Sequence, residues 1–311
     1  MSTGRKLVVI VGPTAVGKSD LALALAKECR GTILSADAMQ IYRGFDRGTG
    51  KPTAEEKRLV PHRLIDVADP RHDFSAGDFV RAADEALVEC QKRRSRPFLV
   101  GGTGLYVRCF LRGIFEGPRR HEALRRRLAT ARDRHGLSYL VRMLERLDPV
   151  TAARIGAADA QRIVRALEVR FATGRPLSDH LAAGRQGNWA GNERMESVKI
   201  GLLCDRDELN GRIGRRVARF FAGGLVDEVR GLLASGIAAS ANAFKGIGYR
   251  QAVEVVRGNS SERQAIEETV RATTRYAKRQ MTWFRQEKDV HWLQAGAAPE
   301  GPLMAAAALI A

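Results

Sequence analysis

The sequence lacks several features that mark whole classes of protein. Its four cysteines, Cys29, Cys90, Cys109 and Cys204, lie far apart, and none has a neighbour at the two-residue spacing of a metal-binding knuckle or a redox pair. We therefore expect reduced thiols. Long apolar runs are also missing. Leu7–Val11 is too short for the core of a signal peptide, and no stretch approaches the roughly 18 apolar residues that would span a bilayer. A cytoplasmic protein that does not bind membranes is expected.

Negative charge is scarce relative to positive charge. The 311 residues include 52 Lys and Arg but only 35 Asp and Glu, which gives a formal net charge of +17. Such a surplus attracts phosphate polymers such as RNA, although an Arg-rich composition can also follow the base content of a genome. The apolar content of 44% and the charged content of 28% are typical of a globular protein. The length suits two domains, or one core with a large insertion.

The order of apolar runs and glycines predicts an α/β fold, a P-loop NTPase-like core with a parallel sheet flanked by helices. Leu7–Val11 is a β-branched run that stops at Gly12-Pro13, and helical spacing resumes over Ser19–Glu28. Further expected elements are the strands Thr32–Leu34, Phe98–Val100 and Val198–Leu203 and the helix Phe79–Arg94. Alternating strands and helices favour helices on both faces of the sheet.

A change of pattern indicates an all-helical insertion domain. From about Arg119 to about Arg175 the strand signals cease, and this segment holds 14 arginines but only 6 acidic residues. The basic charge is therefore concentrated there. We expect the insertion to cover 119–196 and the catalytic core with its C-terminal helices to cover 1–118 and 197–311. Within these limits Gly184–Asn192 is expected to be a loop and the chain up to about Trp292 to be mainly helical, while the Ala-rich tail after Gly296 gives no clear signal.

The segment after the first strand fits a phosphate-binding loop. It consists of Gly12, Pro13, Thr14, Ala15, Val16, Gly17, Lys18 and Ser19. Glycines let an anion approach the backbone, the N–H groups and the helix N-terminus face it, Lys18 neutralises a phosphate, and Ser19 can hold Mg²⁺. The loop leaves the reaction open, since NTPases, ATP-binding kinases and other transferases share it.

Two further signals narrow the reaction. No apolar strand ends in the Asp with which NTP-hydrolysing enzymes bind magnesium, and no Asn-Lys-x-Asp sequence reads guanine. A GTPase switch is therefore not expected, whereas a small-molecule kinase stays open. Asp37 follows Thr32–Leu34, and Thr103 follows Phe98–Val100. Singly they could be a helix cap and a turn residue, but both follow strands at the edge where open α/β sheets bind ligands.

Together these motifs resemble those of the tRNA dimethylallyltransferases, also called tRNA isopentenyltransferases, over nearly the whole chain. Besides the phosphate loop, the resemblance rests on Ser35–Arg43, Gly48–Pro52, Pro61–Asp66, Ser75–Phe79, Gly101–Tyr106, Gln161-Arg162, Arg165–Val169, Gly246–Arg250 and Lys278–Arg285. The zinc-finger extension of eukaryotic members is absent, so the sequence resembles the bacterial form. Ala38 stands where the family usually has Ser, which removes one hydroxyl beside Asp37.

The resemblance implies a reaction and its catalytic residues. A dimethylallyl group would pass from dimethylallyl diphosphate to the exocyclic N6 of the adenine 3′ of the anticodon, releasing diphosphate. Asp37 would be the base that takes the proton from N6, and Thr103 would form a hydrogen bond near the reacting groups. Arg216 would join the phosphate loop on the diphosphate, and Mg²⁺ at Ser19 would be the cofactor.

The resemblance also implies a tRNA-binding set and a monomeric enzyme. The expected contacts are Asp37, Ala38, Met39, Gln40, Thr103, Arg125, Gln161, Arg162, Arg165, Gly248, Tyr249, Arg250, Lys278, Arg279, Gln280, Trp283 and Arg285. The helical insertion would clamp the anticodon stem and loop. A polar, mainly basic stripe on the C-terminal helix, formed by Arg271, Arg275, Lys278, Thr282 and Arg285, fits this role, although such a stripe can equally be a solvated face.

Three other functions remain to be tested. An adenylate isopentenyltransferase would prenylate a free nucleotide with the same core but would not need the basic insertion. A small-molecule kinase would use the loop for ATP. A non-catalytic RNA-binding protein with a phosphate loop would bind tRNA without forming product.

Overall fold

The computed structural model describes residues 6–114, 117–118, 120–186, 193–295 and 300–311. The chain divides into two compact units, which we call the core unit (Met1–Leu111 with Met195–Ala311) and the helical unit (Arg112–Arg194). The sequence analysis placed the insertion at 119–196, so the observed division begins a few residues earlier; Arg119 itself lies outside the described residues. Each unit is described by itself.

The described residues of the core unit form one parallel sheet. Its strands are β1 (Leu7–Val11), β2 (Gly31–Ser35), β3 (His62–Arg63), β4 (Arg96–Val100), β5 (Ser197–Leu203) and β6 (Val290–Gln294). They are arranged in the order β3-β2-β4-β1-β5-β6, with every pair parallel. The register places the last residues of β1, β2 and β4 at one edge, because Ile10 and Ser35 both lie opposite Val100. This edge carries the phosphate loop.

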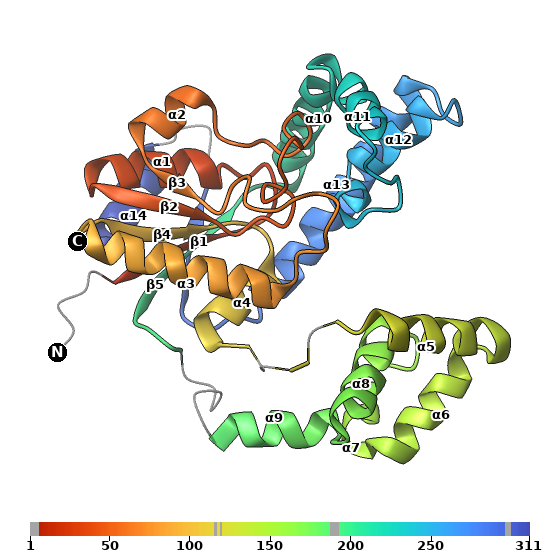
Figure 1. Cartoon of the computed structure of the whole chain (residues 1–311). Helices are drawn as coiled ribbons and strands as arrows, with labels where there is room; N and C mark the ends of the chain where they lie inside the picture. The colour runs from red at the N-terminus through yellow and green to blue at the C-terminus, as the bar shows by residue number, and fades with distance from the viewer. Residues whose placement is uncertain (1–5, 115–116, 119, 187–192, 296–299) are drawn as a thin grey trace. The chain divides into compact units, whose positions relative to one another are not determined.

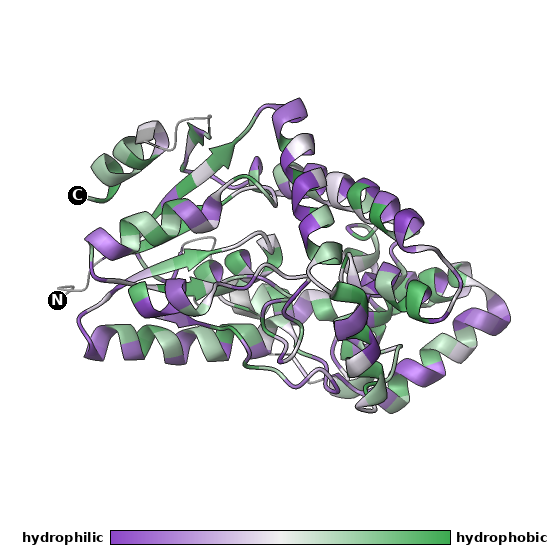
Figure 2. Ribbon diagram, turned by 90° about the horizontal axis from the view of Figure 1, so that it is seen from above, coloured by the Kyte–Doolittle hydropathy of each residue, from purple (hydrophilic) through white to green (hydrophobic). Residues whose placement is uncertain are grey.

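Helices cover both faces of the sheet, which confirms the predicted fold class (Figure 1). On one face, α1 (Lys18–Glu28) and α14 (Glu300–Ile310) pack against apolar side chains of β1, β2 and β4. On the other face lie α3 (Ala76–Lys92) and α4 (Gly104–Arg112). The rings of Phe79 and Tyr106 stack between these two helices, with their centroids 4.2 Å apart. The helix α2 (Ala54–Leu59) precedes the edge strand β3. The central strands are hydrophobic over most of their length, as burial between two helical layers requires (Figure 2).

The structure differs from the sequence expectations at two places and forms a helix in the tail, for which the sequence shows no clear signal. The chain before Trp292 does not end in helix, because Val290–Gln294 is the strand β6, which pairs with β5 and lays the Trp292 ring over Gly201. Such a short, partly exposed edge strand gives little periodic signal. The Ala-rich tail forms α14, whose Ala306 and Ile310 are buried against the sheet layer. Gly184–Gln186, expected in a loop, ends the helix α9; the rest of that segment, 187–192, lies outside the described residues.

The C-terminal helices build a second core beside the active edge of the sheet. They are α10 (Arg206–Ala222), α11 (Leu225–Ala234), α12 (Tyr249–Val256) and α13 (Glu262–Phe284), with a 3-10 turn at Asn242–Lys245. Their apolar faces enclose Ile41, Tyr42 and Phe45, which come from the segment after β2. This packing brings α10 and α13 next to the residues that follow β2.

The helical unit contains α5 (Glu122–His135), α6 (Leu137–Leu147), α7 (Pro149–Ala152), α8 (Ala160–Thr173) and α9 (Leu177–Gln186). No strand occurs in the part of this unit that the structure describes. Its small core consists of Leu128, Leu140, Leu144, Ile163, Ala166 and Leu167. Asp148 is buried and accepts hydrogen bonds from Thr151 and from the Ser178 N–H, which fixes the turn between α6 and α7 against α9.

Two further observations concern the described residues of both units. The four cysteines, all among the described residues, form no disulfide, as expected for reduced thiols. Over the described ranges, no helix combines the length and the apolar character needed to cross a membrane.

Candidate active site

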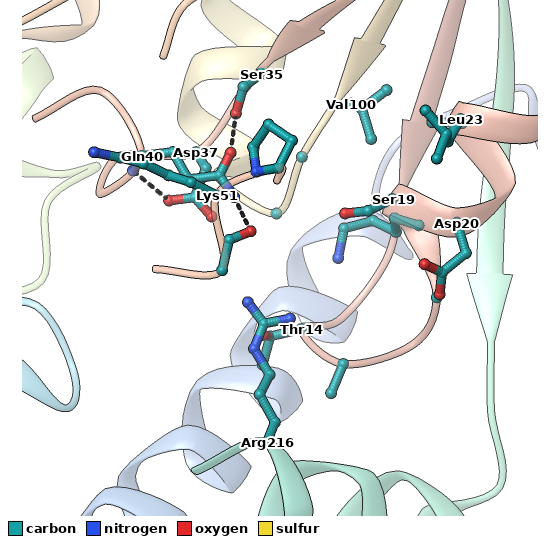
Figure 3. A pocket seen from close by; sticks show the side chains of 18 of the residues that line it. Thr14, Ser19, Asp20, Leu23, Ser35, Asp37, Gln40, Lys51, Val100 and Arg216 are labelled. Carbon is teal, nitrogen blue, oxygen red and sulfur yellow. Dashed lines mark hydrogen bonds between the residues drawn. The ribbon is translucent and has the colours of Figure 1, made fainter. Parts of the chain in front are cut away.

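The active edge of the sheet opens into a pocket of about 500 Å³ within the core unit. The phosphate loop, the segment after β2, the start of the Gly101–Thr103 segment and the helices α10 and α13 all line it. Figure 3 shows Thr14 and Ser19 of the phosphate loop, Asp37 and Gln40 after β2, and Arg216 of α10 arranged around this space. Of the predicted site residues, Lys18, Ser19, Asp37 and Arg216 line this cavity, whereas Thr103 does not.

The phosphate loop has the backbone conformation that an anion site needs. Gly12 and Gly17 have φ angles of +142° and +102°, where side chains are disfavoured. A Cβ atom on Gly12 would also lie 2.8 Å from the Leu202 carbonyl oxygen. No side chain caps the start of α1 at Gly17, so the first N–H groups of α1 are left for a ligand.

The Lys18 side chain spans the phosphate loop, and the charge of its amine depends on whether an anion is bound there. Its Nζ donates a hydrogen bond of 2.6 Å to the Pro13 carbonyl oxygen. Burial of the amine and the positive charge of Arg216 lower the pKa of Lys18 to about 7, although the Asp37 carboxylate acts in the opposite direction. Lys18 is therefore only partly charged near neutral pH until an anion enters the loop.

The helix α10 adds a cluster of arginines to the pocket wall. Arg216 donates to the Thr49 carbonyl oxygen at 3.3 Å, and burial lowers the pKa of its guanidinium. Gly50 makes room for it, because a Cβ atom there would clash with the guanidinium. Arg212, Arg215 and Arg219 line the same pocket. The sequence did not single out these last three, although Arg212 lies four residues before Arg216 and Arg219 three residues after it, a spacing that places them on one helix face.

Asp37 lies on the pocket wall opposite the phosphate loop. Its Oδ1 accepts hydrogen bonds from the Met39 N–H at 2.8 Å and the Gln40 N–H at 3.3 Å. Its Oδ2 has no hydrogen-bond partner among the described residues. The backbone thus fixes one carboxylate oxygen and leaves the other for a substrate.

Gln40 ties the Asp37 segment to the Thr49-Gly50 turn. Its Oε1 accepts a hydrogen bond from the Ser35 hydroxyl at 2.7 Å, and its Nε2 donates to the Gly50 carbonyl oxygen at 2.9 Å (Figure 3). The side chain of Gln40 is therefore occupied by protein partners, and its predicted contact with tRNA stays a prediction.

Thr103 is fixed beside Asp37 by hydrogen bonds between neighbouring strand ends. Its Oγ1 accepts from the Ala38 N–H at 3.0 Å, and its own N–H donates to the Ala36 carbonyl oxygen at 3.2 Å. Gly101 permits this approach, since a Cβ atom there would clash with the same carbonyl oxygen. Ala38 contributes only its backbone N–H to this contact.

Two side chains of α13 reach into the pocket. Gln280 is 5% exposed; its Oε1 accepts from the Thr14 N–H at 2.8 Å and its Nε2 donates to the Gly102 carbonyl oxygen at 2.9 Å. Tyr276, one turn earlier, also lines the pocket, and burial raises the pKa of its phenol to about 12. The sequence analysis missed Tyr276, because it considered only the basic stripe of this helix.

The other predicted contacts on α13 fall into two groups. Trp283 packs against Gly104 at the start of α4, and the Arg108 guanidinium lies 4.1 Å from the ring centre. Lys278, Arg279 and Arg285 are exposed to solvent. The exposed cations are thus available to a polyanion, whereas Trp283 is engaged in packing.

The residues around α12 do not line the pocket but contact the segment at Gly48, next to its wall. Tyr249 is fully buried, and its hydroxyl donates to Glu228 at 2.6 Å and accepts from the Gly48 N–H at 3.1 Å. Burial and the nearby Glu228 carboxylate raise the pKa of Tyr249. Gly248 precedes it with a φ of +95°, and Arg250 is exposed. The tRNA contacts predicted for Gly248, Tyr249 and Arg250 stay predictions, as does that of Met39, which packs against Gly246.

In the helical unit, a buried carboxylate accepts hydrogen bonds from two of the arginines that were predicted to contact RNA. Glu168 is 0% exposed and accepts hydrogen bonds from Arg125 at 2.9 and 3.0 Å and from Arg165 at 2.8 Å. Burial alone would raise the pKa of Glu168, but these hydrogen bonds and one from the His121 N–H bring it to about 2. The Arg125–Glu168 pair therefore joins α5 to α8, whereas Arg165 pairs with Glu168 within α8.

The more accessible side chains of this unit lie elsewhere on the same helices. Gln161 and Arg162 are exposed, and Arg162 pairs with Asp159 at 3.3 Å. Arg126 and Arg127 are exposed on α5 and line a shallow groove of their own. The sequence analysis did not single out Arg126 and Arg127, although they continue the run that begins at Arg125.

The pocket offers few protein groups to a metal ion, so a metal there would be held mainly by the phosphate oxygens of a bound diphosphate. In the described part of the chain, no cluster of three or more His, Cys, Asp and Glu side chains could enclose a metal ion. Ser19 offers a hydroxyl at the mouth of the loop, and Asp20 lies beside it on the pocket wall (Figure 3). Magnesium commonly takes few protein ligands and completes its shell with phosphate oxygens and water, so this donor set fits Mg²⁺ on a bound diphosphate.

Comparisons with known proteins agree along the chain. The IPP transferase family model matches residues 40–287, and an isopentenyl transferase model matches residues 5–65. A tRNA dimethylallyltransferase from Solibacter usitatus is 46% identical over 94% of this chain and 94% of its own length. One from Geobacter metallireducens is 44% identical over 93% of this chain and 92% of its own.

Solved structures show the same fold. The tRNA isopentenylpyrophosphate transferase of Bacillus halodurans has a TM-score of 0.71 and 39% identity, covering 98% of this chain and 95% of that one. A eukaryotic dimethylallyltransferase acting on tRNA has a TM-score of 0.77, covering 94% of this chain and 75% of its own, and at 21% identity it supports the fold alone.

Proposed function

Because the chain belongs to the IPP transferase family, we propose that it is a tRNA dimethylallyltransferase. It transfers the dimethylallyl group of dimethylallyl diphosphate to N6 of the adenine 3′-adjacent to the anticodon, giving N6-isopentenyladenosine and diphosphate. The observation that carries this proposal is the single pocket in which a phosphate loop faces an Asp37 carboxylate with one unoccupied oxygen.

The loop side of the pocket would bind the donor. As the allylic C–O bond breaks, the diphosphate gathers negative charge, so fixed cations stabilise the transition state more than the ground state. Lys18, Arg216 and the N–H groups at the start of α1 supply this stabilisation. Ser19 would hold Mg²⁺, which neutralises part of the diphosphate charge when bound.

Asp37 would activate the acceptor. The N6 lone pair of adenine is delocalised into the ring, which makes the amine a poor nucleophile. A base that takes its proton contributes roughly 10²–10⁴-fold. The bond between N6 and C1 of the donor forms, the bond from C1 to the diphosphate oxygen breaks, and the N6 proton passes to Asp37 Oδ2.

The acceptor base must leave the anticodon loop to reach this pocket, as enzymes that modify bases require. The exposed cations Lys278, Arg279 and Arg285 are proposed to contact RNA phosphates, and the basic helical unit to clamp the stem and loop. Function as a monomer in the cytoplasm remains part of the proposal.

A product assay tests the function against its rivals. Purified protein is incubated with Mg²⁺, dimethylallyl diphosphate and either unmodified tRNA or AMP, and digested nucleosides are analysed by mass spectrometry. Prenylated adenosine from tRNA but not from AMP supports the proposal. Product from AMP alone would identify a nucleotide prenyltransferase, and ATP turnover without prenyl product would identify a kinase. Stable tRNA binding with no product would identify a binding protein.

A further inference from the structure

The turn at residues 46–50 has no role in the reaction as derived so far, yet it holds two side chains of the active pocket. The Thr49 carbonyl oxygen accepts a hydrogen bond from Arg216 at 3.3 Å, and the Gly50 carbonyl oxygen accepts one from Gln40 at 2.9 Å. The position of the Arg216 guanidinium therefore depends on where this turn lies, and the groups that fix the turn become part of the site.

Three consecutive backbone N–H groups of the turn end on side chains of the C-terminal helices. The Glu228 carboxylate, on α11, accepts from the Asp46 N–H at 3.1 Å and from the Arg47 N–H at 3.0 Å. The Tyr249 hydroxyl, at the start of α12, accepts from the Gly48 N–H at 3.1 Å. Successive backbone N–H groups form a concavity that binds anions, and here the anion is a carboxylate of the protein itself.

Glu228 and Tyr249 are also joined to each other. The Tyr249 hydroxyl donates to the Glu228 carboxylate at 2.6 Å, so the phenol oxygen both donates and accepts. The Tyr249 ring is fully buried, with its centroid 4.7 Å from that of Phe45. Gly48 permits the close approach, because a Cβ atom there would lie 2.7 Å from a ring carbon of Tyr249. Neither Glu228 nor Tyr249 lines the pocket, so both hold the turn from outside it.

The turn passes this position on to Arg216. Thr49 directly follows the three anchored residues, and its hydroxyl donates to the Phe45 carbonyl oxygen at 2.8 Å, which closes the turn. The Thr49 carbonyl oxygen is thereby held toward α10, and Gly50 leaves room for the guanidinium. A guanidinium that burial has separated from water needs such an acceptor to keep one orientation.

We infer that Glu228 and Tyr249 are positioning residues, which fix the turn and through the Thr49 carbonyl oxygen aim Arg216 at a diphosphate in the phosphate loop. The inference rests on the function proposed above, and it gives Tyr249 a role other than the tRNA contact that the resemblance implies. Gln40 depends less on the turn, because it also accepts a hydrogen bond from the Ser35 hydroxyl. Loss of either anchor should therefore act mainly on diphosphate binding.

Calorimetric affinity for diphosphate in the presence of Mg²⁺ tests the inference without prenyl donor or RNA. Tyr249→Phe keeps the buried ring and removes its hydroxyl, and Glu228→Gln keeps the size of the side chain and removes one acceptor oxygen. Each is made in wild type and together with Arg216→Gln. The matched control is Glu254→Gln on α12, because Glu254 is also half-buried and accepts from Asn259 at 2.9 Å but has no hydrogen bond with the turn. Melting temperature reports on the folding of every variant.

Tyr249→Phe and Glu228→Gln should each weaken diphosphate binding by about tenfold, the size of one hydrogen bond to a charged group. Combined with Arg216→Gln they should weaken it less than about twofold further, because the residue through which they act is gone. The affinity of Tyr249→Phe for tRNA in filter binding should stay within about twofold of wild type, since the hydroxyl is already used by protein partners. Glu254→Gln should match wild type in every measurement.

Three results would overturn the inference. One is wild-type diphosphate affinity in a folded Tyr249→Phe or Glu228→Gln protein; the two variants change different atoms, so either alone decides if the other fails to fold. Another is a loss of affinity that multiplies with that of Arg216→Gln, because independent effects multiply. The third is weaker tRNA binding by Tyr249→Phe with diphosphate affinity unchanged. Diphosphate binding as predicted but no prenylated tRNA would overturn the proposed function and leave the positioning role standing, whereas a wild type that binds no diphosphate would contradict both.

Discussion

Lys18 makes the affinity for diphosphate depend on pH. In the protein without ligand its pKa is about 7 because the amine is buried next to Arg216. A bound diphosphate places negative charge at the amine and raises this pKa. Below pH 7 Lys18 is charged with or without ligand, so affinity does not change with its titration. Above pH 7 binding must take up a proton, and affinity falls by a factor of about ten per pH unit until the pKa of the complex is reached.

The size of this pH dependence follows from how far a bound diphosphate raises the pKa of Lys18. If the complex keeps Lys18 charged up to pH 9, raising the pH from 7 to 9 weakens binding by up to about 100-fold, or about 2.7 kcal/mol. At pH 8 each bound diphosphate should take up about 0.9 proton on Lys18. Isothermal titration calorimetry in buffers of different ionisation enthalpy measures this uptake directly.

A charge-preserving variant provides the matched comparison. Lys18→Arg stays charged over the whole range, so this variant should keep only the pH dependence that the ligand itself contributes. Lys27→Arg, on the exposed last turn of α1, should behave as wild type. Equal affinity at pH 7 and pH 9 in wild type, with no proton uptake at pH 8, would refute the reasoning about Lys18.

Three other predictions concern the base, the RNA surface and the helical unit. Asp37→Asn should lower the transfer rate by roughly 10²–10⁴-fold while tRNA affinity, measured by filter binding, changes less than twofold; an equal reduction of both would remove the base assignment. Neutralising Lys278, Arg279 and Arg285 with Gln should flatten the log–log salt dependence of tRNA binding by about 0.7–0.9 for each phosphate that the variant no longer neutralises, and an unchanged slope would place the RNA elsewhere. Glu168→Gln should destabilise the protein by about 3 kcal/mol in chemical denaturation, because it leaves two arginines without their buried partner; the exposed Glu145→Gln is the control, and equal stability of the two variants would contradict the role of the ion pairs.

The sequence was sufficient for those parts of the site that depend on local chain geometry. A β-branched run, two glycines and Lys18-Ser19 define a strand, a turn and a helix start within one short segment, and the structure has them where predicted. Asp37 and Thr103 were placed at one edge because parallel strands end together, and the hydrogen bond between Thr103 and the Ala38 N–H shows that they are neighbours.

The remaining parts depend on contacts between distant segments. Tyr276 and Gln280 face the phosphate loop only because α13 packs beside a segment more than 250 residues earlier in the chain, with Gln280 and Thr14 266 positions apart. The resemblance implied that Arg125 contacts tRNA, and the sequence does not show that Arg125 on α5 pairs with the buried Glu168 on α8. The periodicity of a sequence does not predict which charged side chains of two different helices form an ion pair.

In the proposed reaction this pocket joins the first carbon of the donor to N6 of an adenine in tRNA. Formation of this bond can be followed with dimethylallyl diphosphate carrying ¹³C at C1 and an anticodon stem-loop carrying ¹⁵N at N6 of the target adenine. After reaction with the wild-type enzyme, a one-bond coupling between ¹³C and ¹⁵N in the nuclear magnetic resonance spectrum of the RNA is predicted. A prenylated RNA without this coupling, or ¹³C recovered only on free nucleotide, would contradict the account.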